Sequence, residues 1–463
     1  MAKALAIIAV GLTQRQVSSD TPHLAALAQR GSAAPMSSVL PAVTCSAQAT
    51  LLTGKLPREH GVVGNGWMAP DSREVALWRQ ANGQVQGEKI YETARRRDPD
   101  FTCAKLFWWW NMGAAVDWSI TPRPYYPADG RKIPAVYGSP AEFPEGLEAY
   151  LGSFPFFDFW GPKAGLPSSR WIASAAQRTL RIHDPDLTMV YLPHLDYSHQ
   201  RFGPEHPTSR QALTELDALI GELVECADEC GAQTLVLSEY GIEEVSRPVH
   251  INRALREAGL LEVRATPSGE ILDTFASRAF AVSDHQVAHV YCQGEGTLER
   301  TRAVLQDLQG IEQVMDRSEQ GAHGIDHPNS GDLVAVSESG AWFTYYYWTD
   351  PASEPDFART VDIHRKVGYD PCEMFMDPAL PFPHLKVAGY LARKKLGQRG
   401  LLKVIPVDAQ LIRGSHGRLP DRPDDGPVFL SSLEWSATNP EPVGGLVEMT
   451  SVRDRLLGAL GLG

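Results

Sequence analysis

One short segment near the N-terminus constrains the fold of this chain more than any other feature. Residues 40–54 contain Pro41, which fixes a turn, and a helical pattern over residues 46–52. Gly54 follows, and glycine readily takes the positive φ of a helix C-cap. Thr44 stands where the helix would begin, a place where backbone N–H groups and the helix dipole favour a phosphate. On position alone, Thr44 is either an N-capping residue in a turn or a hydroxyl that meets a phosphate group.

The neighbouring motifs decide between these alternatives. Pro57-Arg-Glu-His60-Gly61 and then Asn65 follow the helix, and residues 21–28 (Thr-Pro-His-Leu-Ala-Ala-Leu-Ala) precede it. The combined pattern resembles the nucleophile region of the alkaline phosphatase superfamily, in its nucleotide pyrophosphatase/phosphodiesterase branch. The resemblance implies that Thr44 is the nucleophile, that Asn65 binds a phosphate oxygen, and that a divalent metal, expected to be zinc, assists the reaction at one or two sites.

Apolar runs predict the strands of a central sheet. Residues 4–10, 187–192 and 234–237 are nearly continuous apolar segments, as in parallel strands buried on both faces. Residues 209–230 have helical periodicity, and residues 333–336 form a further apolar run. We therefore expect an α/β fold with a mostly parallel central sheet and helices on both faces, as the resemblance also implies. The whole chain, residues 1–463, is expected to form a single domain.

An aromatic-rich segment interrupts this pattern. Residues 67–168 hold seven of the eleven tryptophans, and Thr121–Pro127 reads as a rigid aromatic loop. Aromatic side chains in such a segment are either core residues or walls of a pocket above the C-terminal edge of the sheet. We expect an insertion, or cap, within the domain. Flat apolar walls would suit a phosphorylated small molecule with an aromatic or apolar moiety.

Composition excludes several classes of protein. The net charge of −13 argues against a nucleic-acid partner, and Arg393-Lys394-Lys395 is expected to be a solvated helix face. Six cysteines in so long a chain do not indicate a disulfide framework. No apolar run approaches the ~20 residues of a membrane span. The apolar residues 4–10 lack a following cleavage site, so we expect a cytoplasmic protein, with export still open.

The metal-ligand positions depart from the pattern of the superfamily. Val10 stands where the resemblance implies an aspartate at the end of the first strand, and Ser238-Glu239-Tyr240-Gly241 replaces the expected Ser-Asp-His-Gly. Asp196 and His416 match the remaining pattern, while Gln200 replaces a histidine. Catalysis with two divalent ions needs carboxylate and imidazole ligands. The candidate metal ligands are Asp196, Glu239 and His416, with His194, His199 and Gln200 as weaker candidates, and the alternative is structural hydrogen bonding. On a strand, the period of two would put His194 on the same side as Asp196.

Two further polar clusters have no counterpart in the resemblance. Either could replace lost ligands or serve as structural partners: Asp284, His285, Gln286 and His289 on an expected strand, and Asp362 and His364 in a loop. On that strand, Asp284 and Gln286 would share one face and His285 would lie on the other. Arg247 and His250 are weaker candidates for an anionic group. Three functions remain open. They are a phosphodiesterase or pyrophosphatase with a threonine nucleophile, a group-transfer enzyme or hydrolase with one metal ion or none, and a noncatalytic protein that binds a phosphorylated ligand.

Overall fold

A mixed eight-stranded sheet forms the centre of the computed structural model, which describes residues 2–128 and 131–463. The strand order is β2-β20-β9-β1-β8-β5-β6-β7. Strands β9, β1, β8, β5 and β6 run parallel, whereas β2, β20 and β7 pair antiparallel at the edges. In sheet order the strands are Ser32–Pro35, Val428–Ser431, Ala232–Leu237, Lys3–Ala9, Leu187–Leu192, Cys103–Leu106, Trp118–Pro122 and Val136–Ser139.

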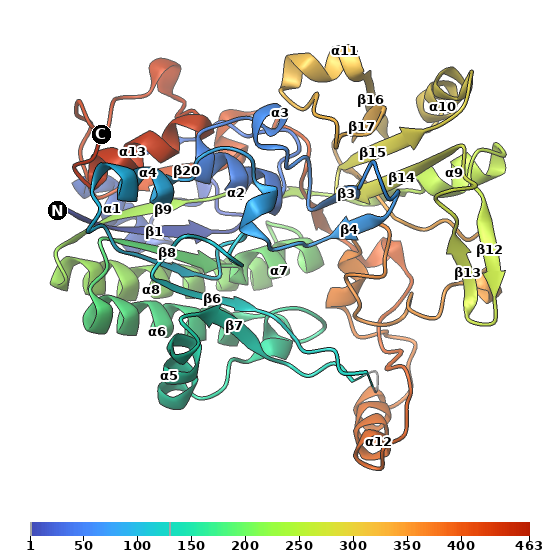
Figure 1. Cartoon of the computed structure of the whole chain (residues 1–463), viewed down its shortest axis with the longest axis horizontal. Helices are drawn as coiled ribbons and strands as arrows, with labels where there is room; N and C mark the ends of the chain where they lie inside the picture. Colours follow the sequence, from blue (N-terminus) through green and yellow to red (C-terminus); the bar gives the residue numbers. More distant parts are fainter. Residues whose placement is uncertain (1, 129–130) are drawn as a thin grey trace.

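Helices cover both faces of this sheet, which confirms the predicted fold class (Figure 1). On one face α8 packs on β9 and β1, and α6 packs on β8. On the other face α13 packs on β1 and contacts both α2 and α4. The helices of this layer system are α1 (Pro22–Arg30), α2 (Thr44–Thr53), α4 (Ile90–Arg97), α5 (Glu142–Leu151), α6 (Leu166–His183), α7 (His194–Phe202), α8 (Pro207–Glu229) and α13 (Val452–Ala459).

The central strands are apolar throughout because both of their faces are covered. Every residue of β8 is buried, and so is every residue of β1 after Lys3. Strands β1, β8 and β9 end at the same edge of the sheet, where Val10, Pro193 and Ser238 follow them. Ligands of open α/β sheets bind outside the carboxyl ends of the strands. This edge is therefore where the candidate residues should meet.

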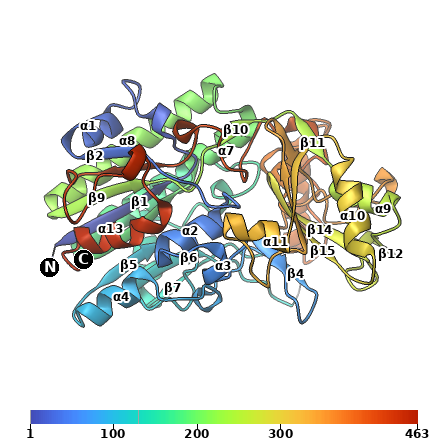
Figure 2. The ribbon, with the colours of Figure 1, turned by 90° about the horizontal axis from the view of Figure 1, so that it is seen from above.

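A second, antiparallel sheet lies beside this edge (Figures 1 and 2). Its order is β14-β15-β17-β16. Residues 333–336, which the sequence predicts as a strand, belong to β17 of this sheet and not to the central one. The elements of this part are β14 (Ala279–Asp284), β15 (Val287–Cys292), β16 (Ile311–Asp316), β17 (Leu333–Ser337), the hairpin β12 (Val263–Thr266) and β13 (Gly269–Leu272), and helices α9 (Ile251–Glu257), α10 (Thr297–Gln306) and α11 (Arg317–Gln320).

The aromatic-rich segment 67–168 is partly built into the central sheet. It supplies β5, β6 and β7, together with α4 and α5. Trp108 and Trp110 are fully buried, whereas Trp78 and Trp160 are only partly buried. One helix, α12 (Pro383–Lys395), stands away from the rest of the molecule (Figure 1). Among the described residues, no helix is both long and apolar enough to cross a membrane.

Candidate active site

Thr44 is the first residue of α2, at the carboxyl edge of the central sheet. The helix starts two residues before the start that the sequence predicts, and Val43 occupies the N-cap position. Thr44 is therefore not the capping residue. Gly54 ends the helix in the left-handed conformation, with φ of 68°. All ten residues of α2 are buried, so the core fixes the helix and with it the position of the Thr44 hydroxyl.

The Thr44 hydroxyl contacts two side chains from the loop after β9. Its Oγ1 donates to Oε2 of Glu239 over 3.3 Å and lies 3.2 Å from the hydroxyl of Tyr240. Gln48, one turn along α2, donates to the other carboxyl oxygen of Glu239. The backbone N–H of Trp109 in turn donates to Oε1 of Gln48. The aromatic-rich segment thus helps to orient Glu239 toward Thr44.

Tyr240 links Thr44 to the other predicted ligands. Its hydroxyl donates to Asp196 over 3.4 Å, and its ring stacks on His416 with a centroid distance of 3.5 Å. Gln200 donates to the second oxygen of Asp196 over 2.9 Å. The structure thereby brings Thr44, Asp196, Glu239, Gln200 and His416 together at one edge of the sheet.

Asn65 lies next to Thr44 in the structure through a hydrogen bond to Cys45 and belongs to a second network. Its side-chain oxygen accepts from the backbone N–H of Cys45, the residue after Thr44, over 3.0 Å. Its side-chain and backbone N–H groups donate to the carboxylate of Asp284 over 3.0 and 2.7 Å. His285 contacts the same carboxylate through Nδ1 over 2.8 Å. Asp284 and His285 are thus parts of the site rather than distant structural residues.

The expected strand through Asp284 and His285 is in fact a tight turn. β14 ends at Asp284, β15 begins at Val287, and the two strands pair antiparallel. His285 sits in the turn with φ of 61°, a left-handed conformation that costs a bulky residue of order 1–3 kcal/mol. The period of two that would place His285 on the opposite face from Asp284 therefore does not apply. Both side chains reach the same site.

Four rings form a continuous stack across the site. Tyr240 lies on His416, His416 lies 3.8 Å from His285, and His285 lies 3.7 Å from Tyr369 by ring centroids. Beyond Tyr369, the rings of Trp78 and Trp160 follow with centroid distances of 6.1 and 5.8 Å. Tyr369 also donates to Oε1 of Gln200 over 2.8 Å. Sequence reasoning assigned no role to Tyr369, and only its place in the polar loop around Asp362 and His364 marked it.

The weaker predicted ligands have other partners. His194 and Asp196 lie on helix α7, not on a strand, so a period of two does not put them on one side. His194 pairs instead with Glu215 over 2.8 Å. His199 lies 3.4 Å from Gln16. The prediction that His194 shares a face with Asp196 is therefore wrong.

The remaining candidate residues have local structural partners. His289 contacts the carbonyl of Val63 and accepts from the backbone of Gly331. Asp362 pairs with Arg365, and the ring of His364 lies edge-on to Tyr126. Other pairs are Arg247 with Glu338, His250 with Thr344, and Gln286 with Glu243.

Burial disfavours the charged forms of the titratable side chains in the site. Burial, with a smaller contribution from Asp196, raises the pKa of Glu239 to about 8. Burial also raises the pKa of Asp196 to about 7. The same effect lowers the pKa values of His285 and His416 well below the usual range. At pH 7 the two imidazoles are therefore neutral, Glu239 is mostly protonated and Asp196 is about half ionised.

The donor set does not fit two metal ions. Val10 offers no ligand atom, and the hydroxyl of Tyr240 takes the position next to Thr44. No group of three or more His, Cys, Asp or Glu side chains in the described parts of the chain is arranged to hold an ion. The imidazole of His416 nevertheless has surroundings typical of a metal ligand. Its Nδ1 contacts the carbonyl of Ala42 over 2.8 Å, and its Nε2 is buried without a partner, as in a histidine oriented for a metal.

A pocket adjoins the site on the far side of Tyr240. It has a volume of about 250 Å³, and Ala42, Tyr240 and Gln286 belong to its wall. Arg15 and Arg418 also line it, together with acidic side chains such as Glu243. Thr44 itself is only 4% exposed. Access of a substrate to Thr44 therefore requires the surrounding side chains to move.

The fold and the residues around Thr44 define an α/β protein of the alkaline phosphatase-like class. Residues 4–370 match the family described as type I phosphodiesterase / nucleotide pyrophosphatase, and the chain belongs to this family. It is 23% identical to human ectonucleotide pyrophosphatase/phosphodiesterase family member 7 over 335 residues, which are 69% of this chain and 63% of that protein. An uncharacterized pyrophosphatase/phosphodiesterase of Schizosaccharomyces pombe is 25% identical over 212 residues, 44% of this chain and 36% of the relative. The chain thus matches less than two thirds of the length of each relative.

Solved structures share the fold over almost the whole chain. Murine ectonucleotide pyrophosphatase/phosphodiesterase 5, an inactive threonine-to-alanine variant in complex with AMP, superposes with a TM-score of 0.60 at 15% identity, covering 100% of this chain and 96% of that one. Phosphonoacetate hydrolase from Sinorhizobium meliloti, in complex with phosphonoformate, gives 0.62 at 15% identity, with 99% and 96% covered. At this identity the likeness concerns the fold.

Proposed function

We propose that this protein is a phosphoester or pyrophosphate hydrolase in which Thr44 is the nucleophile. The observation that carries the proposal is the Thr44 hydroxyl at the start of α2, hydrogen-bonded to Glu239 and Tyr240. A relative of the same fold is inactive as a threonine-to-alanine variant and binds AMP, which supports the same assignment.

The geometry suggests how the protons move. Glu239 in its carboxylate form accepts the Thr44 proton as Oγ1 bonds to phosphorus and the leaving oxygen departs. Glu239 then returns that proton to the leaving oxygen. In the second half, water attacks phosphorus and loses a proton to Glu239. Glu239 passes this proton to Oγ1 of Thr44 as the bond between phosphorus and Oγ1 breaks, which regenerates both residues. Gln48 holds Glu239 in place during both steps.

One divalent ion fits better than two. We assign the ligand role to Asp196 and to the unpartnered Nε2 of His416, with the amide of Gln200 beside them, and zinc is the ion such ligands favour. When bound, the ion would polarise the phosphoryl oxygens. Glu239, the third predicted ligand, is engaged by Thr44 and Gln48, so we assign it to proton transfer.

The substrate we propose is a small phosphorylated molecule with a flat or apolar group, such as a nucleotide. The support is the ring stack that ends in Tyr369, Trp78 and Trp160, because aromatic faces bind flat groups. Asn65 would bind a phosphoryl oxygen through its amide, which Asp284 already orients.

A covalent intermediate tests the proposal. The protein is mixed with a nucleoside triphosphate or a bis-aryl phosphate, quenched in acid, and digested for mass spectrometry. We expect a phosphate or phosphoester on the peptide that contains Thr44, and none in Thr44→Ala. A protein that hydrolyses these substrates fully as Thr44→Ala would refute the assignment.

A group-transfer enzyme is the second candidate, because Thr44 is buried and water has little access to it. An intermediate on Thr44 would then pass its phosphoryl group to an alcohol acceptor. Product analysis with and without an added alcohol separates the two functions. Free phosphate supports hydrolysis, and a new phosphoester supports transfer.

A further inference from the structure

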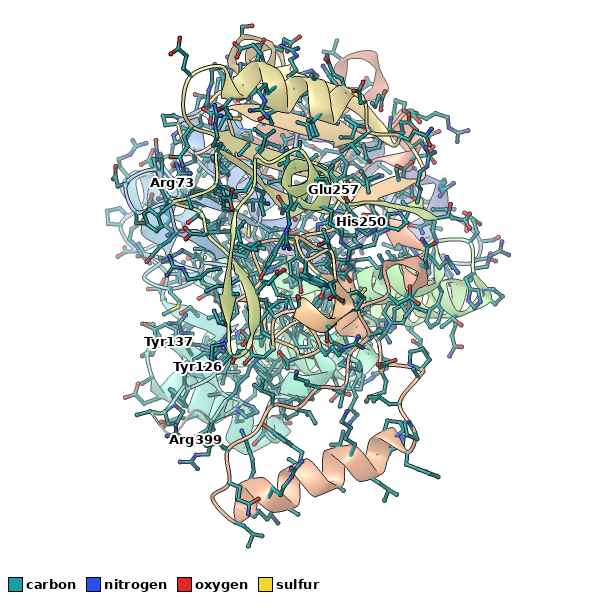
Figure 3. All side chains as sticks on the ribbon, turned by 90° about the vertical axis from the view of Figure 1, so that its right-hand side faces the viewer. Arg73, Tyr126, Tyr137, His250, Glu257 and Arg399 are labelled. Atoms are coloured by element: carbon teal, nitrogen blue, oxygen red, sulfur yellow. The ribbon has the colours of Figure 1, made fainter. Side chains whose placement is uncertain are left out.

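Helix α12 has no protein partner along most of its length. All of its residues are described, and none of them is buried. Figures 1 and 3 show it standing off from the body of the molecule, with Arg399 beyond its C-terminal end. A short helix on its own is marginal in water. We therefore expect a binding partner to cover its exposed face.

The exposed face is apolar where a soluble helix would be polar. Phe382, Leu385, Leu391 and Leu396 are 75%, 69%, 53% and 77% exposed. Leu385, Ala388, Ala392 and Leu396 recur at helical spacing and so form one stripe along α12. Isolated exposed leucines need no explanation, but a stripe of this kind on a protruding helix marks an interaction surface.

Positive charge surrounds this stripe. Residues 378–407 contain no Asp or Glu, although the whole chain carries a net charge of −13. At helical spacing, Arg393 and Lys395 fall on opposite flanks of the stripe. The Lys and Arg residues of this basic segment are Lys386, Arg393, Lys394, Lys395, Arg399 and Lys403.

An exposed aromatic loop points to the same edge of the molecule. Tyr125 and Tyr126, which follow β6, are 61% and 55% exposed. Figure 1 shows the chain after β6 reaching toward α12, and Figure 3 shows Tyr126 on the same side of the molecule as α12. Tyrosine is enriched where proteins meet the interface between lipid and water.

We propose that α12 docks the protein on an anionic lipid membrane surface, with the Leu385–Leu396 stripe in the interface and the flanking basic residues against the headgroups. Apolar and basic residues in this arrangement are the signature of a helix that lies in the plane of the membrane. A flat surface suits a helix that stands clear of the body. The exposed tyrosines beside α12 favour a membrane over an acidic protein groove, because such a groove would take the helix alone. This inference does not rest on the proposed function.

Vesicle sedimentation with the full chain tests it. We expect the protein to sediment with vesicles of phosphatidylcholine and phosphatidylglycerol, to bind pure phosphatidylcholine far less, and to be released by salt. Each basic residue near an anionic surface strengthens binding about fivefold. Arg393→Glu/Lys395→Glu should therefore weaken binding more than about 20-fold. The charge-matched control is Arg210→Glu/Arg300→Glu, on α8 and α10, and should bind like the wild type.

The apolar stripe has its own pair of variants. Leu385→Ser/Leu396→Ser should abolish sedimentation, whereas Ile182→Ser/Val443→Ser, at two other exposed aliphatic residues, should not. A wild type that stays in the supernatant, or α12 variants that bind like it, would overturn the proposal. So would a wild-type dimer that Leu385→Ser/Leu396→Ser converts to monomer, because a second copy would then cover the face.

Discussion

Tyr240 lies flat on His416, with ring centroids 3.5 Å apart and planes inclined by 7°. The stack places the phenol oxygen between Thr44 and Asp196, within 3.2 and 3.4 Å of their oxygens. A phenol at this position contributes a hydrogen bond where the superfamily pattern has a histidine ligand. Tyr240 thus fills space beside Thr44 with a group that is a hydrogen-bond donor and not an imidazole.

Removing the Thr44 hydroxyl should abolish activity with little loss of stability. Thr44→Ala should lower the rate of phosphodiester hydrolysis on the order of a thousandfold or more, and Thr44→Ser should keep part of it. The variant loses one buried hydrogen bond to Glu239, worth about 1 kcal/mol. Rates and thermal unfolding of both variants measure this. Thr53→Ala, on the same helix, is the control and should retain full activity.

Restoring the missing ligands should raise the metal content. The wild type should purify with at most one divalent ion per chain, because Val10 and Tyr240 offer no carboxylate or imidazole. Val10→Asp/Tyr240→His should bind an additional ion, measured by elemental analysis after dialysis against zinc. Val10→Asn/Tyr240→Phe makes similar changes in size without strong ligands and should not. Two ions in the unmodified protein would contradict this account.

The free energy of unfolding should fall as pH rises above about 5, because the pKa of Glu239 is higher in the folded state than in the unfolded state. Burial raises its pKa from an ordinary value of 4.5 to about 8, so between these values the folded state holds a proton that the unfolded state releases. The resulting stabilisation is complete below the unfolded pKa and is lost as pH rises through 8. Glu239→Gln should flatten the dependence of the urea midpoint on pH in metal-free buffer. The control is Glu225→Gln, which replaces an exposed carboxyl group and should show the same dependence of the urea midpoint on pH as the wild type. If Glu239→Gln also showed the wild-type dependence, the effect of burial would be contradicted.

A buried charge cluster holds the loop that carries Tyr369. Lys366 Nζ lies 2.7 Å from both Asp370 and Glu373, and its side chain is 1% exposed. Lys366→Met leaves these carboxylates buried without a cation, which should cost about 3–5 kcal/mol of unfolding free energy.

Urea unfolding measures this loss. Lys55→Met removes a lysine from an exposed pair with Glu59 and should change stability by less than about 1 kcal/mol. Similar losses in the two variants would show that the cluster does not support the loop.

The sequence predicted the parts of the site that local patterns encode. The buried first strand and the helix after Pro41 follow from local patterns. The approach of Asp196, Glu239 and His416 to Thr44 follows from the resemblance of their motifs to the superfamily pattern. The contributions of Asp284 and His285 could not be predicted, because they depend on a two-residue turn in a second sheet that contacts Asn65 from 219 residues away. The prediction that His194 lies on the same side as Asp196 was wrong for a local reason. Their segment was interpreted as a strand but forms helix α7, and a helix turns successive side chains by a different angle.

The ring stack also gives the protein an internal optical signal. Tyr240, His416, His285 and Tyr369 are in direct contact, and Trp78 and Trp160 pack against the last of them. A molecule that pushes the rings apart to reach Thr44 changes the surroundings of both indoles at once. Intrinsic fluorescence can thus report occupancy of the site for any ligand, before its chemistry is known.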